Sequence, residues 1–139
     1  MMASTTISIC VAILLLLIFA PSNSSCRTTM NSGDTLITSD SLVLGFCGFT
    51  MQSDCNLVLY VLGRSVWDTK SYGRGDRCQL ELTRNGQLVI SNNGVSVWKN
   101  SFQGEDDNYV LKLQEDGNVV IFNSNENGVW FTNTSVSCS

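Results

Sequence analysis

A short pattern of residues recurs three times along the chain at a constant interval, and this repeat limits the possible folds more than any other feature. The three copies begin at Gln52, Thr83 and Gln114, each 31 residues after the one before. A Val-Trp pair accompanies each copy and places tryptophans at positions 67, 98 and 130. Self-similarity at a fixed period indicates one structural unit used repeatedly. The sequence therefore predicts a domain built from three equivalent units.

The first copy lies in residues 51–60, which we interpret as a β-strand because side chains on a strand alternate between two faces. One face of this strand would carry Gln52, Asp54, Asn56, Val58 and Tyr60. Two amides, a carboxylate and a phenol can bond several neighbouring hydroxyls, while the valine offers a C–H surface to a sugar ring. This pattern predicts a sugar-binding site. The alternative is a solvated strand face whose polar pattern arose by chance.

The other two copies depart from the first to different degrees. The third consists of Gln114, Asp116, Asn118, Val120 and Phe122. It lacks only the phenolic hydroxyl, and because one lost hydrogen bond costs on the order of 1 kcal/mol, we expect a weakened site. The middle copy consists of Thr83, Asn85, Gln87, Val89 and Ser91. It keeps only the valine, which predicts a structural unit that does not bind sugar.

Turn signals and short apolar runs make up most of the chain after residue 26. Asn-Gly or Asp-Gly pairs occur at 85–86, 93–94, 116–117 and 127–128. Asn-Gly between apolar runs is the strongest short-range hairpin signal. The single proline is Pro21, and no sustained helical periodicity follows the first 25 residues. The sequence therefore predicts an all-β fold.

The intact first copy, Gln-x-Asp-x-Asn-x-Val-x-Tyr, and its period resemble the bulb-type mannose-binding lectins of monocots, the snowdrop-lectin and gastrodianin group. The resemblance covers roughly residues 30–134. It implies a type II β-prism, in which three antiparallel four-stranded sheets surround a pseudo-threefold axis. Trp67, Trp98 and Trp130 would be the central packing residues rather than surfaces that stack on a ligand, since large aromatics dominate core energetics.

The same resemblance implies a role for each motif residue. Asp54 and Asn56 would bond the axial 2-hydroxyl of mannose, Gln52 the 3-hydroxyl and Tyr60 the 4-hydroxyl, while Val58 packs on the ring carbons. A site built for one hydroxyl leaves its polar groups unpaired when an epimer binds, and discrimination follows. One shallow site binds weakly, so several sites would engage a branched high-mannose glycan together.

The expected partners are mannose-containing glycans and glycoproteins, together with a second copy of the chain. The resemblance implies a homodimer formed by exchange of a C-terminal strand at about residues 128–134. Asn133-Thr-Ser in that segment is an N-glycosylation sequon, and a glycan there could hinder dimer formation. With 8 basic against 12 acidic residues and a net charge of −4, no basic patch predicts binding to nucleic acid or a membrane.

Residues 1–25 read as a secretory signal peptide cut between residues 20 and 25, followed by the lectin domain at 26–139. The apolar run at 7–20 is shorter than the roughly 20 residues that a transmembrane helix needs. We therefore expect a protein secreted to the extracellular space, the apoplast, with delivery to the vacuole as the alternative.

Six cysteines in a chain with such a leader predict an oxidising compartment. Cys10 would leave with the leader, and the resemblance pairs Cys55 with Cys78. Cys26, Cys47 and Cys138 are additional to the family pattern. We expect Cys26 to pair with Cys138 because chain ends often lie close together, which leaves one of the three free or bonded to another chain.

The sequence argues against an enzyme, a cofactor and a metal site. The chain has no histidine, which removes the commonest general base and metal ligand. Asp106 and Asp107 are interpreted as a solvated turn rather than a catalytic pair. The main alternative is a β-prism protein that no longer binds sugar and acts as a storage, taste-modifying or antifungal protein. The intact Asp54 and Asn56 favour a lectin, with defence against fungi or insects as the role that the resemblance implies.

Overall fold

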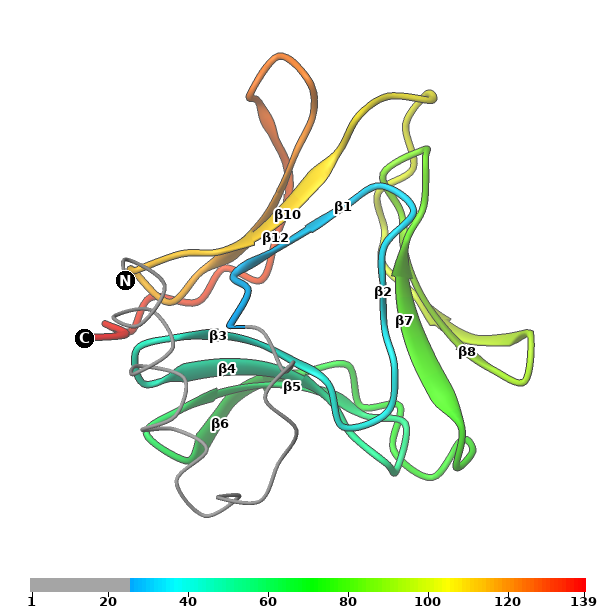
Figure 1. Cartoon of the computed structure of the whole chain (residues 1–139), viewed down its shortest axis with the longest axis horizontal. Helices are drawn as coiled ribbons and strands as arrows, with labels where there is room; N and C mark the ends of the chain where they lie inside the picture. Colours follow the sequence, from blue (N-terminus) through cyan, green and yellow to red (C-terminus); the bar gives the residue numbers. More distant parts are fainter. Residues whose placement is uncertain (1–25) are drawn as a thin grey trace, which may run out of the picture.

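The computed structural model describes residues 26–139, and the predicted leader lies outside them. The described residues form twelve strands without a helix, as the sequence predicted. The strands lie in three antiparallel four-stranded sheets around a common centre, so the predicted β-prism is confirmed (Figure 1). No helix of the described chain is long and apolar enough to cross a membrane.

Each sheet contains three or four consecutive strands of one repeat, and strands from the N-terminal segment complete the second and third sheets. The first sheet contains β3 (Ser41–Leu44), β4 (Cys47–Met51), β5 (Leu57–Val61) and β6 (Arg64–Asp68). The second contains β2 (Thr35–Leu36), β7 (Cys78–Leu82), β8 (Leu88–Asn92) and β9 (Val95–Lys99). The third contains β1 (Thr29–Asn31), β10 (Val110–Leu113), β11 (Val119–Phe122) and β12 (Gly128–Phe131). Because β1 pairs with β10 and β2 with β7, the N-terminal segment connects the third sheet to the second (Figure 1).

The core consists of the inward side chains of all three sheets. The fully buried residues include Met30, Leu42, Phe49, Leu57, Leu59, Leu80, Leu82, Leu88, Ile90, Leu111 and Ile121. Burial alternates along β4 and β10, as expected for strands with one face on a core. Full burial of one such side chain contributes about 1.5–3 kcal/mol, so this set dominates the stability of the fold.

One tryptophan from each sheet reaches the centre of the prism. The ring of Trp67 lies 6.4 Å from that of Trp98 and 5.9 Å from that of Trp130, with interplanar angles of 82° and 78°. Edge-to-face geometry of this kind adds about 0.5–1.5 kcal/mol per aromatic pair beyond area burial. The three rings pack on the core and on one another, which accounts for their position in every repeat.

Residues 51–60 are not one strand, so that prediction is wrong in part. Strand β4 ends at Met51, β5 begins at Leu57, and residues 52–56 form a turn. The turn is closed by hydrogen bonds from Cys55 N to Gln52 O at 3.1 Å and from Gln52 N to Asn56 O at 2.9 Å. The same pair of bonds closes residues 83–87 and 114–118 in the other two units.

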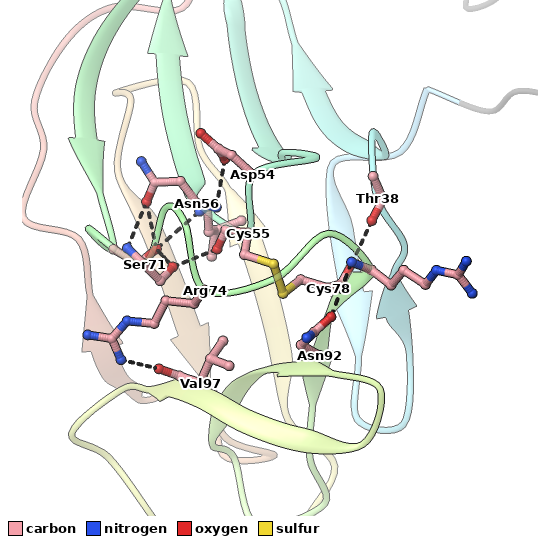
Figure 2. The surroundings of a disulfide bond; sticks show 12 residues. Thr38, Asp54, Cys55, Asn56, Ser71, Arg74, Cys78, Asn92 and Val97 are labelled. Carbon is pink, nitrogen blue, oxygen red and sulfur yellow. Dashed lines mark hydrogen bonds between the residues drawn. A yellow bond between two sulfur atoms is a disulfide. The ribbon is translucent and has the colours of Figure 1, made fainter.

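The first turn was missed because a cysteine stands where the other copies have glycine. Cys55 has φ +74°, and Gly86 and Gly117 at the equivalent positions have φ +79° and +77°. A left-handed conformation costs a residue other than glycine about 1–2 kcal/mol. The Cys55–Cys78 disulfide, which the sequence predicted, fastens this turn to β7 (Figure 2). It closes 23 residues of chain and stabilises the fold by roughly 3 kcal/mol on a chain-entropy estimate.

The predicted Cys26–Cys138 disulfide is wrong, because Cys138 pairs with Cys47 at a Cα–Cα distance of 5.2 Å. The C-terminal segment runs back over the third turn, with Cys138 N donating to Glu115 O at 3.0 Å. Its end reaches the β3–β4 hairpin, where Phe46 N donates to Cys138 O at 2.6 Å. Cys26 is disulfide-bonded as well, so the described residues do not contain the expected free cysteine.

The segment expected to exchange between subunits completes a sheet of its own chain. Strand β12 pairs with β11, with Val120 opposite Phe131 and Ile121 opposite Trp130. The following residues are tied to the same chain by the Cys47–Cys138 disulfide. The C-terminal strand therefore occupies, within one chain, the place that a partner's strand would take.

Candidate sugar-binding site

The register of the first sheet sets which side chains share its outer face. Val58 on β5 lies opposite Thr50 on β4 and opposite Asp68 on β6. Residues paired in antiparallel strands project from the same face, and Leu59 and Trp67, one position along, project to the core. Val58, Tyr60 and Asp68 therefore belong to the outer face, where the sequence placed the first copy of the motif.

The turn brings the beginning of the motif back over this face. The Nε2 amide of Gln52 donates to the phenolic oxygen of Tyr60, which joins the two ends of the motif. Asp54 is exposed at the turn, and its Oδ1 accepts from the backbone N–H of Asn56 at 2.9 Å. Gln52 and Asp54 therefore reach the site from a turn rather than from the strand that the sequence predicted.

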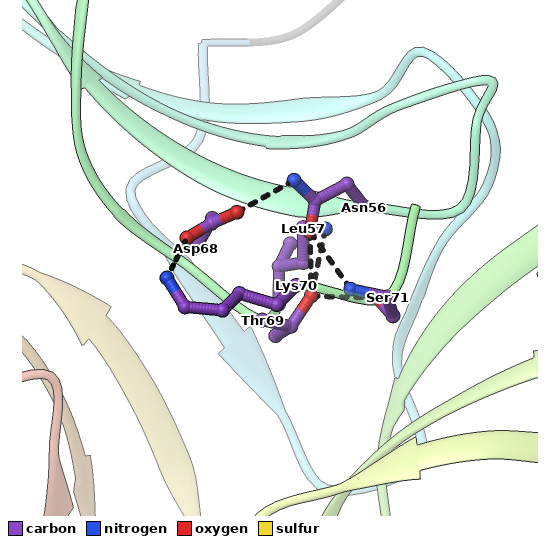
Figure 3. A network of polar contacts seen from close by, with 6 residues as sticks. All are labelled: Asn56, Leu57, Asp68, Thr69, Lys70 and Ser71. Carbon is purple, nitrogen blue, oxygen red and sulfur yellow. Dashed lines mark hydrogen bonds and ion pairs between the residues drawn. The ribbon is translucent and has the colours of Figure 1, made fainter. Parts of the chain in front are cut away.

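Asn56 is the most firmly held residue of the motif, and only 8% of its surface is exposed. Its Oδ1 accepts from Thr69 Oγ1 at 3.0 Å and from Ser71 N at 3.2 Å. Its Nδ2 donates to Asp68 Oδ2 at 2.9 Å, as Figure 3 shows. Because both ends of the amide are bonded, its orientation is fixed and one N–H remains for a ligand.

Three residues of this network, Asp68, Thr69 and Ser71, were not identified from the sequence. They follow Trp67 directly, and only the β5–β6 register places them beside Asn56. Ser71 Oγ also donates to Cys55 O at 2.7 Å, which links the network to the disulfide (Figure 2). The Val-Trp pair that follows every copy of the motif was the available signal, because it marks the strand after each motif.

The third copy reproduces much of this scaffold. Asn118 Oδ1 accepts from Thr132 Oγ1 at 3.0 Å and from Thr134 N at 3.3 Å, and Asn118 N donates to Asp116 Oδ1 at 3.0 Å. Phe122 has no hydroxyl for Gln114 to bond, and the Lys112 ammonium lies 5.5 Å from its ring centroid. The bonds to Asn118 Oδ1 repeat those to Asn56 Oδ1. Phe131 stands where Asp68 accepts from Asn56, so the third copy differs at the amide nitrogen as well as at the aromatic end.

The middle copy makes bonds of another kind. The hydroxyl of Thr83 donates to Asn85 Oδ1 and also accepts from Gln87 N. Asn100 takes the place of Thr69 and accepts from Leu88 N at 3.1 Å, but its Nδ2 lacks a hydrogen-bond partner within the described chain. The polar side chains of this turn bond one another. Gln87, at the position of Asn56, donates from Nε2 to Asn100 O at 3.5 Å, a longer bond than any that Asn56 makes.

The acidic loop at residues 103–108 is held by hydrogen bonds to the loop between β11 and β12. Asp107 accepts from Ser124 Oγ at 2.9 Å and from Ser124 N at 3.1 Å, and these bonds hold the pKa of its carboxyl below the usual value. An ionised carboxylate that ties two loops together is a structural group. Residues 26–139 contain no cluster of three or more side chains suited to a metal ion.

The fold defines a β-prism lectin, and known structures agree. The chain is similar to a monomeric mannose-binding lectin of Gastrodia elata, with 39% identity and a TM-score of 0.78 over 79% of this chain and 100% of that chain. A snowdrop (Galanthus nivalis) agglutinin complexed with methyl-α-D-mannoside is 37% identical, with a TM-score of 0.69 over 80% of this chain and 100% of the other. The chain belongs to the monocot mannose-binding lectin family, which confirms the resemblance.

Sequence relatives match over a shorter stretch. The chain is 42% identical to Curculin-2 of Molineria latifolia over 59 residues, which are 42% of this chain and 37% of that protein. The chain thus spans less than half the length of this curated relative. No model of a known protein family matches the sequence.

Proposed function

We propose that the protein is a secreted plant lectin that binds α-D-mannose and high-mannose glycans through the first copy of the motif. The observation that carries this proposal is the fixed amide of Asn56, which the motif turn and β6 hold beside Asp54 and Val58. Membership of the monocot lectin family supports the same sugar. The similar proteins of Gastrodia and snowdrop are lectins. We therefore propose that this protein binds sugar without catalytic activity, cofactor or metal.

The five motif residues offer complementary groups to a mannose ring. The exposed carboxylate of Asp54 accepts from a hydroxyl, and a charge-assisted bond of this kind is roughly twice as strong as a neutral one. The free N–H of Asn56 donates a hydrogen bond to a ligand hydroxyl beside the Asp54 carboxylate. Gln52 and Tyr60 already bond each other, so a ligand hydroxyl would join an existing hydrogen-bond pair. Val58 is 3% exposed and offers a small apolar floor.

The other copies contribute less. The third copy keeps the bonded amide of Asn118 but not the phenol, and we propose that it binds the same sugar more weakly. The middle copy serves as a structural unit. With one strong and one weak site, useful affinity for a glycan comes from simultaneous engagement of both sites, because effective concentration multiplies the two affinities.

The contacts of the C-terminal segment support a monomeric protein. Exchange of β12 would require the Cys47–Cys138 disulfide to open and the bond from Val136 N to Asp116 O, 2.9 Å long, to break. These contacts support a monomer over the dimer that the resemblance implies. We also propose secretion to the apoplast, glycosylation at the exposed Asn133, and a defence role against fungi or insects.

A second candidate is a sugar-inactive protein that acts through its surface. Phe46 and Leu62 are large apolar side chains that are 58% and 67% exposed, and Leu62 N donates to Phe46 O at 3.0 Å. They lie away from the motif turn and would serve contacts with another macromolecule. The similarity to Curculin-2 and the altered middle copy are consistent with this candidate.

Calorimetric titration with methyl-α-mannoside and a branched high-mannose glycan separates the two candidates. Wild-type protein should bind both, and Asp54→Ala should lose most of the monosaccharide signal. Asn85→Ala is the matched control, because Asn85 stands at the same motif position in the middle copy and should leave binding unchanged. Wild-type protein that binds neither sugar would overturn the lectin proposal.

A further inference from the structure

Asp68 lies on the ligand side of the first copy although it is outside the five-position motif. It stands opposite Val58 across the β5–β6 pair, and the outer face therefore carries both side chains. Its carboxylate accepts from Asn56 Nδ2, which the motif assigns to the ligand. Figure 3 shows the Asp68 carboxylate beside the Asn56 amide. A sugar that rests on Val58 would have this carboxylate at its edge, because the two residues are paired across the strands.

The hydrogen-bonding capacity of Asp68 is only partly used. Its Oδ2 accepts from Asn56 at 2.9 Å, while its Oδ1 lies 3.5 Å from the ammonium of Lys70. The Lys70 side chain is 82% exposed, and exposed ion pairs of this kind contribute little. A carboxylate offers about four lone-pair sites, and the Asp68 side chain keeps 24% of its surface exposed. Asp68 can therefore accept a hydrogen bond from a ligand.

The bond to Asn56 also limits which ligand group Asp68 can reach. The two N–H bonds of an amide diverge by about 120°, so two acceptors at ~2.9 Å from one nitrogen stand roughly 5 Å apart. A hydroxyl held by the free N–H of Asn56 is therefore too far from Asp68 Oδ2 to bond both residues. The Oδ2 oxygen of Asp68 must accept from another hydroxyl of the ligand.

The equivalent position has different chemistry in the other two sheets. Lys99 stands opposite Val89 in the second sheet, and Phe131 stands opposite Val120 in the third. One register position thus carries an anion, a cation and an aromatic ring in turn. Among the three sheets, only the first combines an intact motif with a carboxylate at this position.

We propose that Asp68 is a sixth sugar-binding residue of the first copy and accepts a hydrogen bond from a second ligand hydroxyl. This hydroxyl belongs either to the same mannose ring or to the adjoining sugar residue. The inference rests on the proposed mannose binding of that copy. Because the acceptor is charged, its contribution is that of a charge-assisted bond.

The test compares wild-type protein with Asp68→Ala, Asp68→Asn and the control Lys99→Ala. Each is titrated with methyl-α-mannoside, its monodeoxy derivatives and an α-linked dimannoside. Asp68→Ala should weaken binding about tenfold, and Asp68→Asn, which keeps a neutral acceptor, about threefold. Lys99→Ala should match wild type. Thermal unfolding of every variant shows whether a loss of binding reflects a loss of folding.

A thermodynamic cycle that combines Asp68→Ala with each monodeoxy ligand identifies the hydroxyl that Asp68 binds. If Asp68 bonds a ring hydroxyl, removal of that hydroxyl has no further effect in Asp68→Ala, because the two losses are not additive. If it bonds the adjoining sugar, Asp68→Ala weakens the dimannoside and spares the monosaccharide. Unchanged or tighter binding of both ligands by Asp68→Ala, or additive losses throughout, would overturn the inference. Wild-type protein that binds no sugar would instead overturn the proposed function itself.

Discussion

Gly117→Ala probes how closely the C-terminal segment packs on the third turn, and Gly63→Ala is its matched control. Gly117 and Gly63 have nearly equal φ angles of +77° and +76°. A Cβ on Gly117 would lie 2.1 Å from the carbonyl oxygen of Val136, whereas a Cβ on Gly63 meets nothing within 4 Å. The two substitutions therefore share the backbone cost and differ in the clash.

The expected magnitudes follow from that difference. A left-handed alanine costs about 1–2 kcal/mol in either variant. In Gly117→Ala the C-terminal segment must also move, because the new Cβ would clash with it. This movement should weaken or break the hydrogen bonds from Val136 N to Asp116 O and from Cys138 N to Glu115 O. Each hydrogen bond contributes about 0.5–1.5 kcal/mol, so Gly117→Ala should be less stable than Gly63→Ala by about 1–3 kcal/mol.

Unfolding of the two variants in guanidinium chloride measures this difference. If their m-values are equal, the difference in stability appears as a shift of the unfolding midpoint. Hydrogen exchange provides a local readout, since the amides of Val136 and Cys138 should exchange faster in Gly117→Ala alone. Equal destabilisation of the two variants, with both amides unchanged, would refute the close packing of the C-terminal segment on the turn.

Three further predictions concern the disulfide, the third copy and the acidic loop. Replacing Cys47 and Cys138 by serine removes a link between residues 91 apart and should lower the free energy of unfolding by about 4–5 kcal/mol on the chain-entropy estimate. The variant should also form a concentration-dependent dimer in size-exclusion chromatography. An unchanged stability would contradict this prediction. Phe122→Tyr restores a phenol to the third copy and should tighten the mannoside binding of that copy by about 1 kcal/mol, roughly fivefold. A titration that resolves two sites measures the change. No gain in affinity would show that the phenol is not the missing group. Ser124→Ala should raise the pKa of Asp107 toward its usual value in a carboxyl NMR titration. A carboxyl group whose pKa is lower in the folded state stabilises the fold at pH values above its unfolded-state pKa. This stabilisation is lost as the pH falls through the folded-state pKa. Ser124→Ala should therefore be less stable than wild type at neutral pH and equally stable in strong acid.

The features that sequence predicted well are those set by local spacing. The interval from Gln52 to Gln114 predicted three units, and the Asn-Gly turn at 93–94 predicted the hairpin between β8 and β9. The tryptophan spacing of 32 residues in the last repeat, against 31 before it, also has a structural cause. The turn between β11 and β12 covers residues 123–127, whereas the one between β8 and β9 covers residues 93–94. Since β11 and β12 are each one residue shorter than β8 and β9, the longer turn adds one residue in all.

The features that sequence missed depend on contacts between distant strands. Asp68 follows its tryptophan without any motif of its own, and only the β5–β6 register brings it to Asn56. Cys55 concealed a turn because a disulfide, rather than a glycine, maintains its left-handed backbone. The Cys47–Cys138 pairing depends on the path of the last residues over the third turn, which no local pattern encodes.

Titration of isotopically labelled protein with methyl-α-mannoside, followed by amide chemical shifts, tests most directly where the sugar binds. The account predicts that amides of residues 52–60 shift first, together with that of Asp68. Residues 114–122 should follow at higher sugar concentration, and residues 83–91 should not respond. Shifts confined to the middle copy, or no shifts at any concentration, would contradict a lectin that works through its first turn.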